Sequence, residues 1–121
     1  MTAIRILIME DVEDDIDLLR ATLDQSGLEY SLTAVDSESS LDNALARDEF
    51  DVAVVDFVLP KFGGLDAMRA MKERRPQLPI ILFTGALDEA TLAAVDGNAD
   101  VKLHKRDLAQ LPAAITSVVH R

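Results

Sequence analysis

The stretch VAVV at residues 52–55, followed by Asp56, decides the fold. A short, fully apolar run of this kind is typical of a strand that is covered on both faces of a sheet. A loop containing Pro60 and Gly63-Gly64 leads from it into a helical pattern, which has to end before Pro76 because the residue preceding a proline avoids helical backbone. The inward side of that helix carries Leu65, Met68 and Met71. The local pattern is therefore strand, loop, helix.

The same alternation recurs along the rest of the chain. Short apolar or alternating runs predict four more strands, at residues 3–9 (AIRILIM), 30–35 (YSLTAV), 80–83 (IILF) and 100–104 (DVKLH). A helical pattern follows each of them, with these apolar positions and end signals: Val12, Ile16, Leu19 and Leu23; Leu41, Ala44 and Leu45, capped by Ser37; Leu92 and Val95, closed by Gly97-Asn98; and Leu108, Leu111, Ile115 and Val118, with Pro112 in the opening turn.

Five strands alternating with five helices predict an α/β fold in which helices cover both faces of a parallel sheet. The three fully apolar strands belong at the centre of the sheet, and the two with polar residues, at 30–35 and 100–104, belong at its edges. The strand order 2-1-3-4-5 of the flavodoxin-like, (βα)5 arrangement satisfies this requirement. Ligands of such sheets bind beyond the carboxyl ends of the strands, which directs attention to the residues there.

Composition limits the classes of function. The 121 residues suffice for a single domain spanning 1–121, and 12 Lys and Arg against 22 Asp and Glu leave a net charge of −10. That charge opposes non-specific binding to nucleic acid, and the lack of cysteine excludes disulfides, thiol catalysis and thiolate metal sites. Because no apolar run is long enough to span a bilayer and no signal peptide is recognisable, we expect a soluble cytoplasmic protein with no membrane contact.

Polar residues follow four of the predicted strands directly. They are Glu10 and Asp11, Asp56, Thr84, and Lys105. Each has an ordinary explanation when taken alone, as a helix-start acid, a turn residue, a cap or a solvated charge. Because the carboxyl ends of parallel strands meet at one edge of the sheet, we expect all of them to converge on one rim.

The chemistry of this set points to phosphoryl transfer. Three neighbouring carboxylates repel one another unless a cation offsets their charge, and a set of oxygen ligands suits a hard ion such as Mg²⁺. A carboxylate beside Mg²⁺, with an ammonium and a hydroxyl nearby, is equipped to attack a phosphoryl group while the cations neutralise its oxygens. The product would be an aspartyl phosphate on Asp56.

With these residues the chain resembles the receiver domain of response regulators in two-component signalling, the CheY-like superfamily. The resemblance covers nearly the whole chain and rests on ILIMED (6–11), VVDFVLPKFGGLDAM (54–68), PIILFTGA (79–86) and DVKLHKRDL (100–108). It implies a phosphoacceptor switch in a phosphorelay rather than an enzyme, with a sensor histidine kinase or a histidine phosphotransfer protein as donor. The downstream protein partner is not identified by the sequence.

The resemblance also implies a role for each site residue. Asp11 would bind Mg²⁺ directly, and Glu10 directly or through water. Asp56 would take the phosphoryl group, and the backbone carbonyl of Val58 would complete the metal shell. Thr84 and Lys105 would contact the phosphoryl oxygens.

Three positions depart from the family pattern. Arg106 follows the lysine where the family usually has a proline, so no cis peptide bond is expected there. Lys102 occupies the place of an aromatic residue that turns inward on activation, and an ammonium is costly to bury in that space. Output would therefore use another part of the face formed by the fourth helix, the fifth strand and the fifth helix. The third departure is Glu10, where Asp is commoner.

Two other readings compete with a phosphorylated receiver. Lys102 and Arg106 favour a degenerate receiver that serves as a phosphorylation-independent docking module, although the complete acidic, Thr and Lys set opposes it. A flavodoxin-like ligand-binding enzyme is disfavoured because the chain has no glycine-rich nucleotide loop. Asp14, Asp15 and Asp17 are expected to be a solvated helix start.

Overall fold

A computed structural model describes residues 3–56, 63–85, 88–95 and 97–120. The elements in chain order are β1 (Ile4–Met9), α1 (Glu13–Ser26), β2 (Tyr30–Val35), α2 (Glu38–Arg47), β3 (Val52–Val55), α3 (Gly64–Arg74), β4 (Ile80–Thr84), α4 (Glu89–Val95), β5 (Val101–His104), the 3₁₀ helix η1 (Lys105–Gln110) and α5 (Leu111–Val119). The predicted alternation of strand and helix is confirmed in type and order, with most element ends within one or two residues.

All strand pairs are parallel, and the sheet order is β2-β1-β3-β4-β5. The apolar strands β1, β3 and β4 occupy the centre, while β2 and β5 form the edges, as their polar alternation predicts. In register, Met9 of β1 lies beside Val55 of β3, so the residues that follow these two strands leave the sheet side by side.

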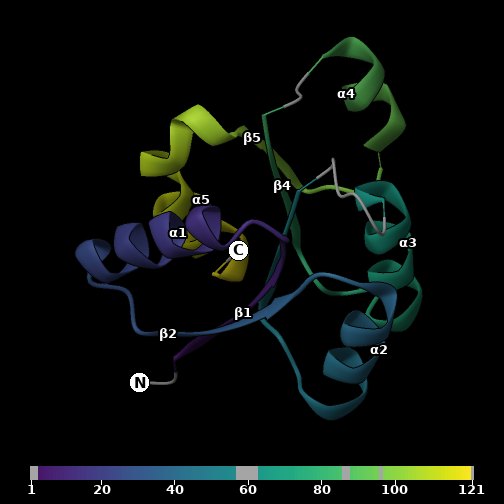
Figure 1. Cartoon of the computed structure of the whole chain (residues 1–121), viewed down its shortest axis with the longest axis horizontal. Helices are drawn as coiled ribbons and strands as arrows, with labels where there is room; N and C mark the ends of the chain where they lie inside the picture. The colour runs from purple at the N-terminus through teal and green to yellow at the C-terminus, as the bar shows by residue number, and fades with distance from the viewer. Residues whose placement is uncertain (1–2, 57–62, 86–87, 96, 121) are drawn as a thin grey trace.

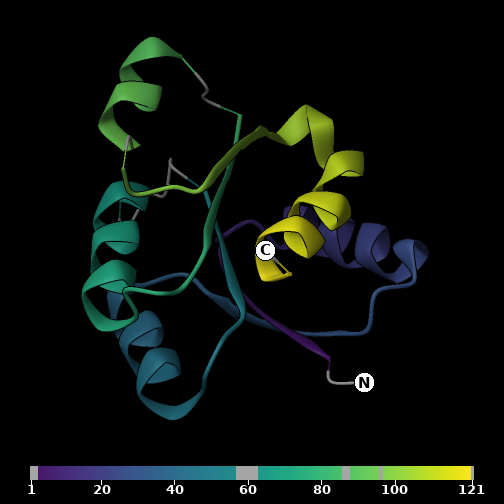
Figure 2. The ribbon, with the colours of Figure 1, turned by 180° about the vertical axis from the view of Figure 1, so that it is seen from behind.

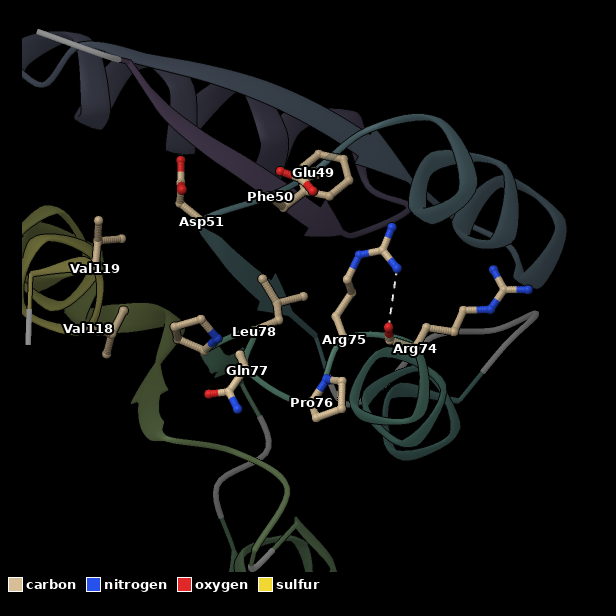
Figure 3. Close-up of a pocket in the computed structure, with 11 residues that line it drawn as sticks. Glu49, Phe50, Asp51, Arg74, Arg75, Pro76, Gln77, Leu78, Val118 and Val119 are labelled. Atoms are coloured by element: carbon tan, nitrogen blue, oxygen red, sulfur yellow. Dashed lines mark hydrogen bonds between the residues drawn. The ribbon is translucent and has the colours of Figure 1, made fainter.

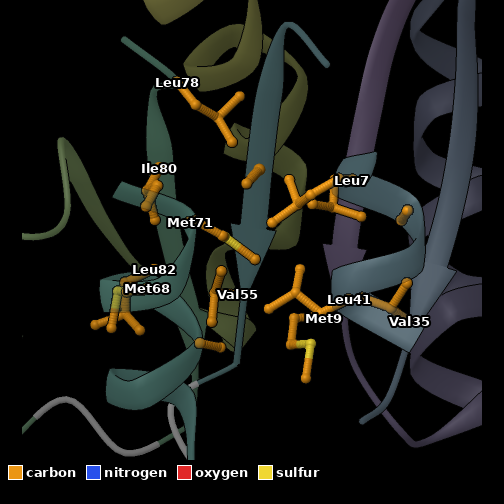
Figure 4. Packing of buried hydrophobic residues seen from close by; sticks show 14 of the residues in the cluster. Leu7, Met9, Val35, Leu41, Val55, Met68, Met71, Leu78, Ile80 and Leu82 are labelled. Atoms are coloured by element: carbon orange, nitrogen blue, oxygen red, sulfur yellow. The ribbon is translucent and has the colours of Figure 1, made fainter. Parts of the chain in front are cut away.

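Helices cover both faces of the sheet, as Figures 1 and 2 show from opposite sides. Helices α1 and α5 lie on one face, and α2, α3 and α4 lie on the other. Each face has its own apolar core. Figure 4 shows the core beneath α2 and α3, where Leu41, Met68 and Met71 pack against Leu7 and Val55 of the sheet.

Local signals explain where the helices begin and end. Ser37 caps α2 with a complete capping box, since its side chain accepts from the Ser40 backbone N–H while the Ser40 hydroxyl accepts from the Ser37 N–H. Helix α3 ends at Arg74, before Pro76 as predicted. Gly97, which follows α4, adopts the left-handed conformation at φ +83°, where a Cβ is unfavourable.

Two predicted inward-facing positions are wrong. Val12 is the N-cap of α1 rather than part of its buried stripe, and it is 45% exposed. Leu92 is 36% exposed because the short helix α4 turns Thr91 and Val95 toward the sheet instead. Thr91 and Val95 are four residues apart and therefore lie on the same face of the helix. The inward face of α4 thus contains the predicted Val95, with Thr91 in place of Leu92.

No helix within the described ranges has the length and apolar character needed to cross a bilayer. Each described peptide bond is trans, including the one between Lys105 and Arg106, as the missing proline predicts.

Candidate functional site

The backbone continues the sheet one residue beyond β1 and β3 and so brings Glu10 and Asp56 to the same rim. The Glu10 N–H donates to the carbonyl of Val35 and the Asp56 N–H donates to the carbonyl of Met9, each over 3.1 Å. Thr84 is the last residue of β4 and is buried, and Lys105 follows β5. The structure thus places these four predicted residues at the carboxyl ends of four strands.

The ammonium of Lys105 joins three carboxylates. Its Nζ lies 2.9 Å from Glu10 Oε2, 3.1 Å from Asp56 Oδ2 and 2.7 Å from Asp15 Oδ2. An ammonium has three N–H donors, so each carboxylate takes one. In this arrangement Lys105 supplies the positive charge that a cluster of acids requires.

The Glu10 carboxylate is held from two sides. Its Oε1 accepts the backbone N–H groups of Asp11 and Val12 at 3.1 and 3.2 Å, while Oε2 faces Lys105. The residue is only 4% exposed. Burial, together with the charge of Asp56, raises the pKa of the Glu10 carboxyl above its ordinary value, although the hydrogen bond from Lys105 acts in the opposite direction.

Lys105 is firmly charged. Partial burial acts to lower the pKa of its ammonium, but hydrogen bonds with Asp15 and Glu10 and the nearby charge of Asp56 outweigh burial and raise the pKa above its ordinary value. The site therefore keeps a permanent positive charge beside Asp56.

A histidine fixes the turn that carries Lys105. His104 is the N-cap of η1, and its Nδ1 accepts the backbone N–H of Arg106 over 3.0 Å. The bond depends on the backbone N–H of Arg106, which the proline of the family pattern would lack, and the Lys105–Arg106 peptide is trans.

The donor set suits a hard cation, because all side chains of the predicted metal set are carboxylates. Within the described part of the chain, however, no three acidic or histidine side chains are arranged to hold a metal ion. Lys105 contacts Glu10 and Asp56, and Asp11 is exposed. Val58, whose carbonyl was predicted as a ligand, lies outside the described residues.

Asp15 is the site residue that sequence reasoning missed. It was expected to be part of a solvated helix start, but it makes the shortest of the three contacts to Lys105. The available signal was its position in the first turn of α1, which begins at the rim only three residues after Glu10. Asp14 and Asp17 are exposed as expected.

Lys102 lies on the edge strand β5, opposite Leu82 of β4, and is exposed. An exposed ammonium here agrees with the cost of burying it. The structure does not test whether this face changes on activation, so the switch face stays a prediction.

A cavity of about 510 Å³ lies at the opposite end of the sheet (Figure 3). Its wall includes Asp51 and Pro79, which precede β3 and β4, so it is remote from the rim that carries Asp56. The two arginines on its wall are engaged by the chain itself, because Arg74 pairs with Asp42 and Arg75 donates to the carbonyls of Leu45 and Arg74. This cavity therefore has no part in the site.

Comparison with known proteins agrees with this geometry. A model of the response regulator receiver domain matches residues 6–116. The response regulator protein PilR of Pseudomonas aeruginosa is 31% identical over 121 residues, which cover 98% of this chain and 27% of PilR. The response regulator receiver protein CpdR of Brucella abortus is 31% identical over 109 residues, which cover 86% of this chain and 89% of CpdR. The chain thus spans about a quarter of the length of PilR but most of CpdR.

A solved structure shows the same fold. The BeF3-activated receiver domain of DrrB, from Thermotoga maritima, matches with a TM-score of 0.85 at 22% identity, covering 99% of this chain and all of that one. The ends of four strands bring an acid pair, an aspartate, a threonine and a lysine to one rim. The family model also matches most of the chain. The chain belongs to the response regulator receiver domain family of two-component systems.

Proposed function

We propose that Asp56 accepts a phosphoryl group from a phosphohistidine of a sensor histidine kinase or a histidine phosphotransfer protein. Phosphorylation then changes a protein–protein contact surface, and the domain acts through such contacts in the cytoplasm rather than as an enzyme or on nucleic acid. The observation that carries the proposal is the contact of 3.1 Å between the Lys105 ammonium and Asp56 Oδ2 at the carboxyl end of the central strand β3.

The residues of this chain account for the reaction. A carboxylate oxygen of Asp56 attacks the phosphorus atom, an oxygen–phosphorus bond forms, and the phosphorus–nitrogen bond to the donor imidazole breaks. The bonding electron pair leaves with the imidazole nitrogen, which takes up a proton. Lys105 offsets charge on the phosphoryl oxygens, and the Thr84 hydroxyl donates a hydrogen bond to one of them.

Mg²⁺ fits the oxygen-only donor set and would supply further positive charge at the phosphoryl oxygens. Glu10, Asp11 and Asp56 would hold it with the carbonyl of Val58. Asp56 is 8% exposed, so its side chain is shielded from most of the surrounding water.

The test is phosphorylation by a small donor. We expect wild-type protein incubated with Mg²⁺ and acetyl phosphate to gain the mass of one phosphoryl group, and Asp56→Asn or EDTA to abolish the gain. Asp36→Asn is the matched control, because Asp36 follows the edge strand β2 as Asp56 follows β3, but Asp36 is exposed. Asp36→Asn protein should be phosphorylated as the wild type is.

The competing reading predicts a different result. A docking module that works without phosphorylation would show no mass gain at saturating donor and Mg²⁺, and that result would overturn the proposal. A gain that persists in Asp56→Asn would also overturn it, because the phosphoryl group would then reside on another residue.

A further inference from the structure

Lys105 has one more carboxylate partner than the proposed reaction uses. Glu10 and Asp56 are strand-end residues, but Asp15 comes from the first turn of α1. Its Oδ2 accepts from Lys105 Nζ over 2.7 Å, and its side chain is 35% exposed. The contact joins residues 90 positions apart in the chain.

The contact between Asp15 and Lys105 matters because Lys105 and a divalent cation would both bind Glu10 and Asp56. The proposed cation ligands Glu10 and Asp56 are the other two partners of the ammonium, so Lys105 and a divalent cation share the same two carboxylates, and their positive charges repel each other there. A cation binds these carboxylates more strongly when the ammonium withdraws from at least one of them. Asp15 is the single partner of the three that the cation does not need, and it is the carboxylate on which Lys105 can remain.

The surrounding structure holds the Asp15–Lys105 pair in place. Asp15 is fixed near the start of α1, where its backbone N–H donates to the carbonyl of Val12 over 3.1 Å. Helices α1 and α5 pack on the same face of the sheet through Leu19, Leu23 and Ile115, and η1 joins β5 to α5. Because Lys105 Nζ already lies 2.7 Å from Asp15 Oδ2, the ammonium can release Glu10 and remain bound to Asp15.

We propose that Asp15 is a positioning residue that retains the Lys105 ammonium when a divalent cation takes over Glu10 and Asp56. This inference rests on the proposed function insofar as those two carboxylates bind the cation. Asp15 thereby lowers the cost of displacing Lys105 and strengthens cation binding, and it keeps the ammonium at the rim, ready for the phosphoryl oxygens.

The test measures Mg²⁺ binding by isothermal titration calorimetry, with no phosphoryl donor present. We expect Asp15→Asn to weaken binding about tenfold, the lower end of the usual effect of residues that orient a metal ligand shell. Asp17→Asn is the matched control, because it removes the same charge from an exposed position of α1 that makes no ion pair with another described residue. Screening by solvent should limit its effect to about threefold or less.

A double-mutant cycle separates positioning from charge alone. In Lys105→Met protein no ammonium competes for the acids, so Mg²⁺ should bind more tightly and Asp15→Asn should have no larger effect than Asp17→Asn. If Asp15→Asn keeps its full effect in that background, the inference is overturned. If Lys105→Met does not fold, the comparison of Asp15→Asn with Asp17→Asn in the wild-type background decides it.

The outcomes distinguish this inference from the function on which it rests. Equal effects of Asp15→Asn and Asp17→Asn, with normal wild-type binding and phosphorylation, would overturn the role of Asp15 alone. A wild-type protein that binds no Mg²⁺ would overturn the cation-binding part of the proposed function, and this inference with it.

Discussion

Away from the site, an ion pair between Arg5 and Asp51 links strand β1 to the start of strand β3. Arg5 of β1 donates from Nε and Nη2 to the two carboxylate oxygens of Asp51, at 3.2 and 3.1 Å, and its backbone N–H donates to the same carboxylate at 2.8 Å. The hydrogen bonds from the Arg5 side chain, which outweigh partial burial, lower the pKa of the Asp51 carboxyl below its ordinary value of 3.8.

The lowered pKa of Asp51 predicts a loss of stability in acid. The pair stabilises the fold fully above the unfolded-state pKa, and the contribution disappears as the pH falls from about 3.8 through the lower folded-state pKa. Asp51→Asn should therefore reduce the difference in unfolding free energy between pH 7 and acid by up to about 1 kcal/mol, given the solvent exposure of the pair. Urea unfolding across a pH series measures this.

Asp48→Asn serves as the control for Asp51, because it removes a nearby exposed acid at the end of α2. Its pH dependence of stability should match that of the wild type. Parallel curves for Asp51→Asn and the wild type below pH 4 would contradict the assignment.

At the residue scale, the position of a residue at the end of a predicted strand is enough to place it at the site. The contact of Asp15 with Lys105 could not be predicted in this way. Glu10, Asp56 and Lys105 each follow a strand, and Thr84 is the last residue of one, so the parallel direction of the strands brings all four to the rim. Asp15 also reaches it, but through the angle at which α1 crosses the sheet and the turn that brings Lys105 back 90 residues later. Neither the angle nor the turn is encoded in a local pattern around Asp15.

At the scale of elements, the turn after β5 is a distinctive feature of this chain. We expect His104→Ala to weaken the start of η1, because the Arg106 N–H loses its acceptor, and to cost about 1 kcal/mol, as for other helix caps. His104→Asn should recover most of the loss, since an asparagine oxygen is a good cap. Urea unfolding gives the free energies, and amide exchange at Arg106 reports the bond itself.

Equal stability losses in His104→Ala and His104→Asn would show that the imidazole acts by packing rather than as a cap. Faster exchange at Arg106 in the alanine variant alone is the result that the cap predicts. The measurement bears on function because the residue between the cap and its donor is Lys105.

The helices also show where periodicity is a reliable guide. In α2, three apolar residues and a capping serine agree, and Leu41, Ala44 and Leu45 are all buried as predicted. In α4, seven residues offer only two apolar side chains of any size, and the pattern does not distinguish Leu92 from Thr91 as the inward residue. Contacts with the sheet decide between them, and those contacts are not visible in so short a segment.

At the scale of the whole molecule, the central strands couple the two cores. Successive side chains of a strand point to opposite faces. Leu7 and Met9 of β1 thus belong to the core beneath α2 and α3, whereas Ile6 and Ile8 belong to the core beneath α1 and α5. A central strand is buried on both faces, so its side chains are apolar on both faces. This is why the sequence could predict which strands lie at the centre of the sheet.

A matched pair of leucines tests this two-sided core. Leu7 is fully buried in β1, and Leu18 on α1 is 57% exposed. We expect Leu7→Ala to lower the free energy of unfolding by about 3 kcal/mol, through lost apolar burial and the cavity left behind, and Leu18→Ala to lower it by less than about 0.5 kcal/mol.

Urea unfolding followed by far-ultraviolet circular dichroism and by the fluorescence of Tyr30, the single tyrosine, provides both the energies and a test of cooperativity. Because β1 contributes to both cores, the two signals should shift together in Leu7→Ala, with one shared midpoint. Separate midpoints would mean that the layer containing α1 and Tyr30 unfolds independently of the layer beneath α2 and α3, contrary to a sheet whose central strand serves both.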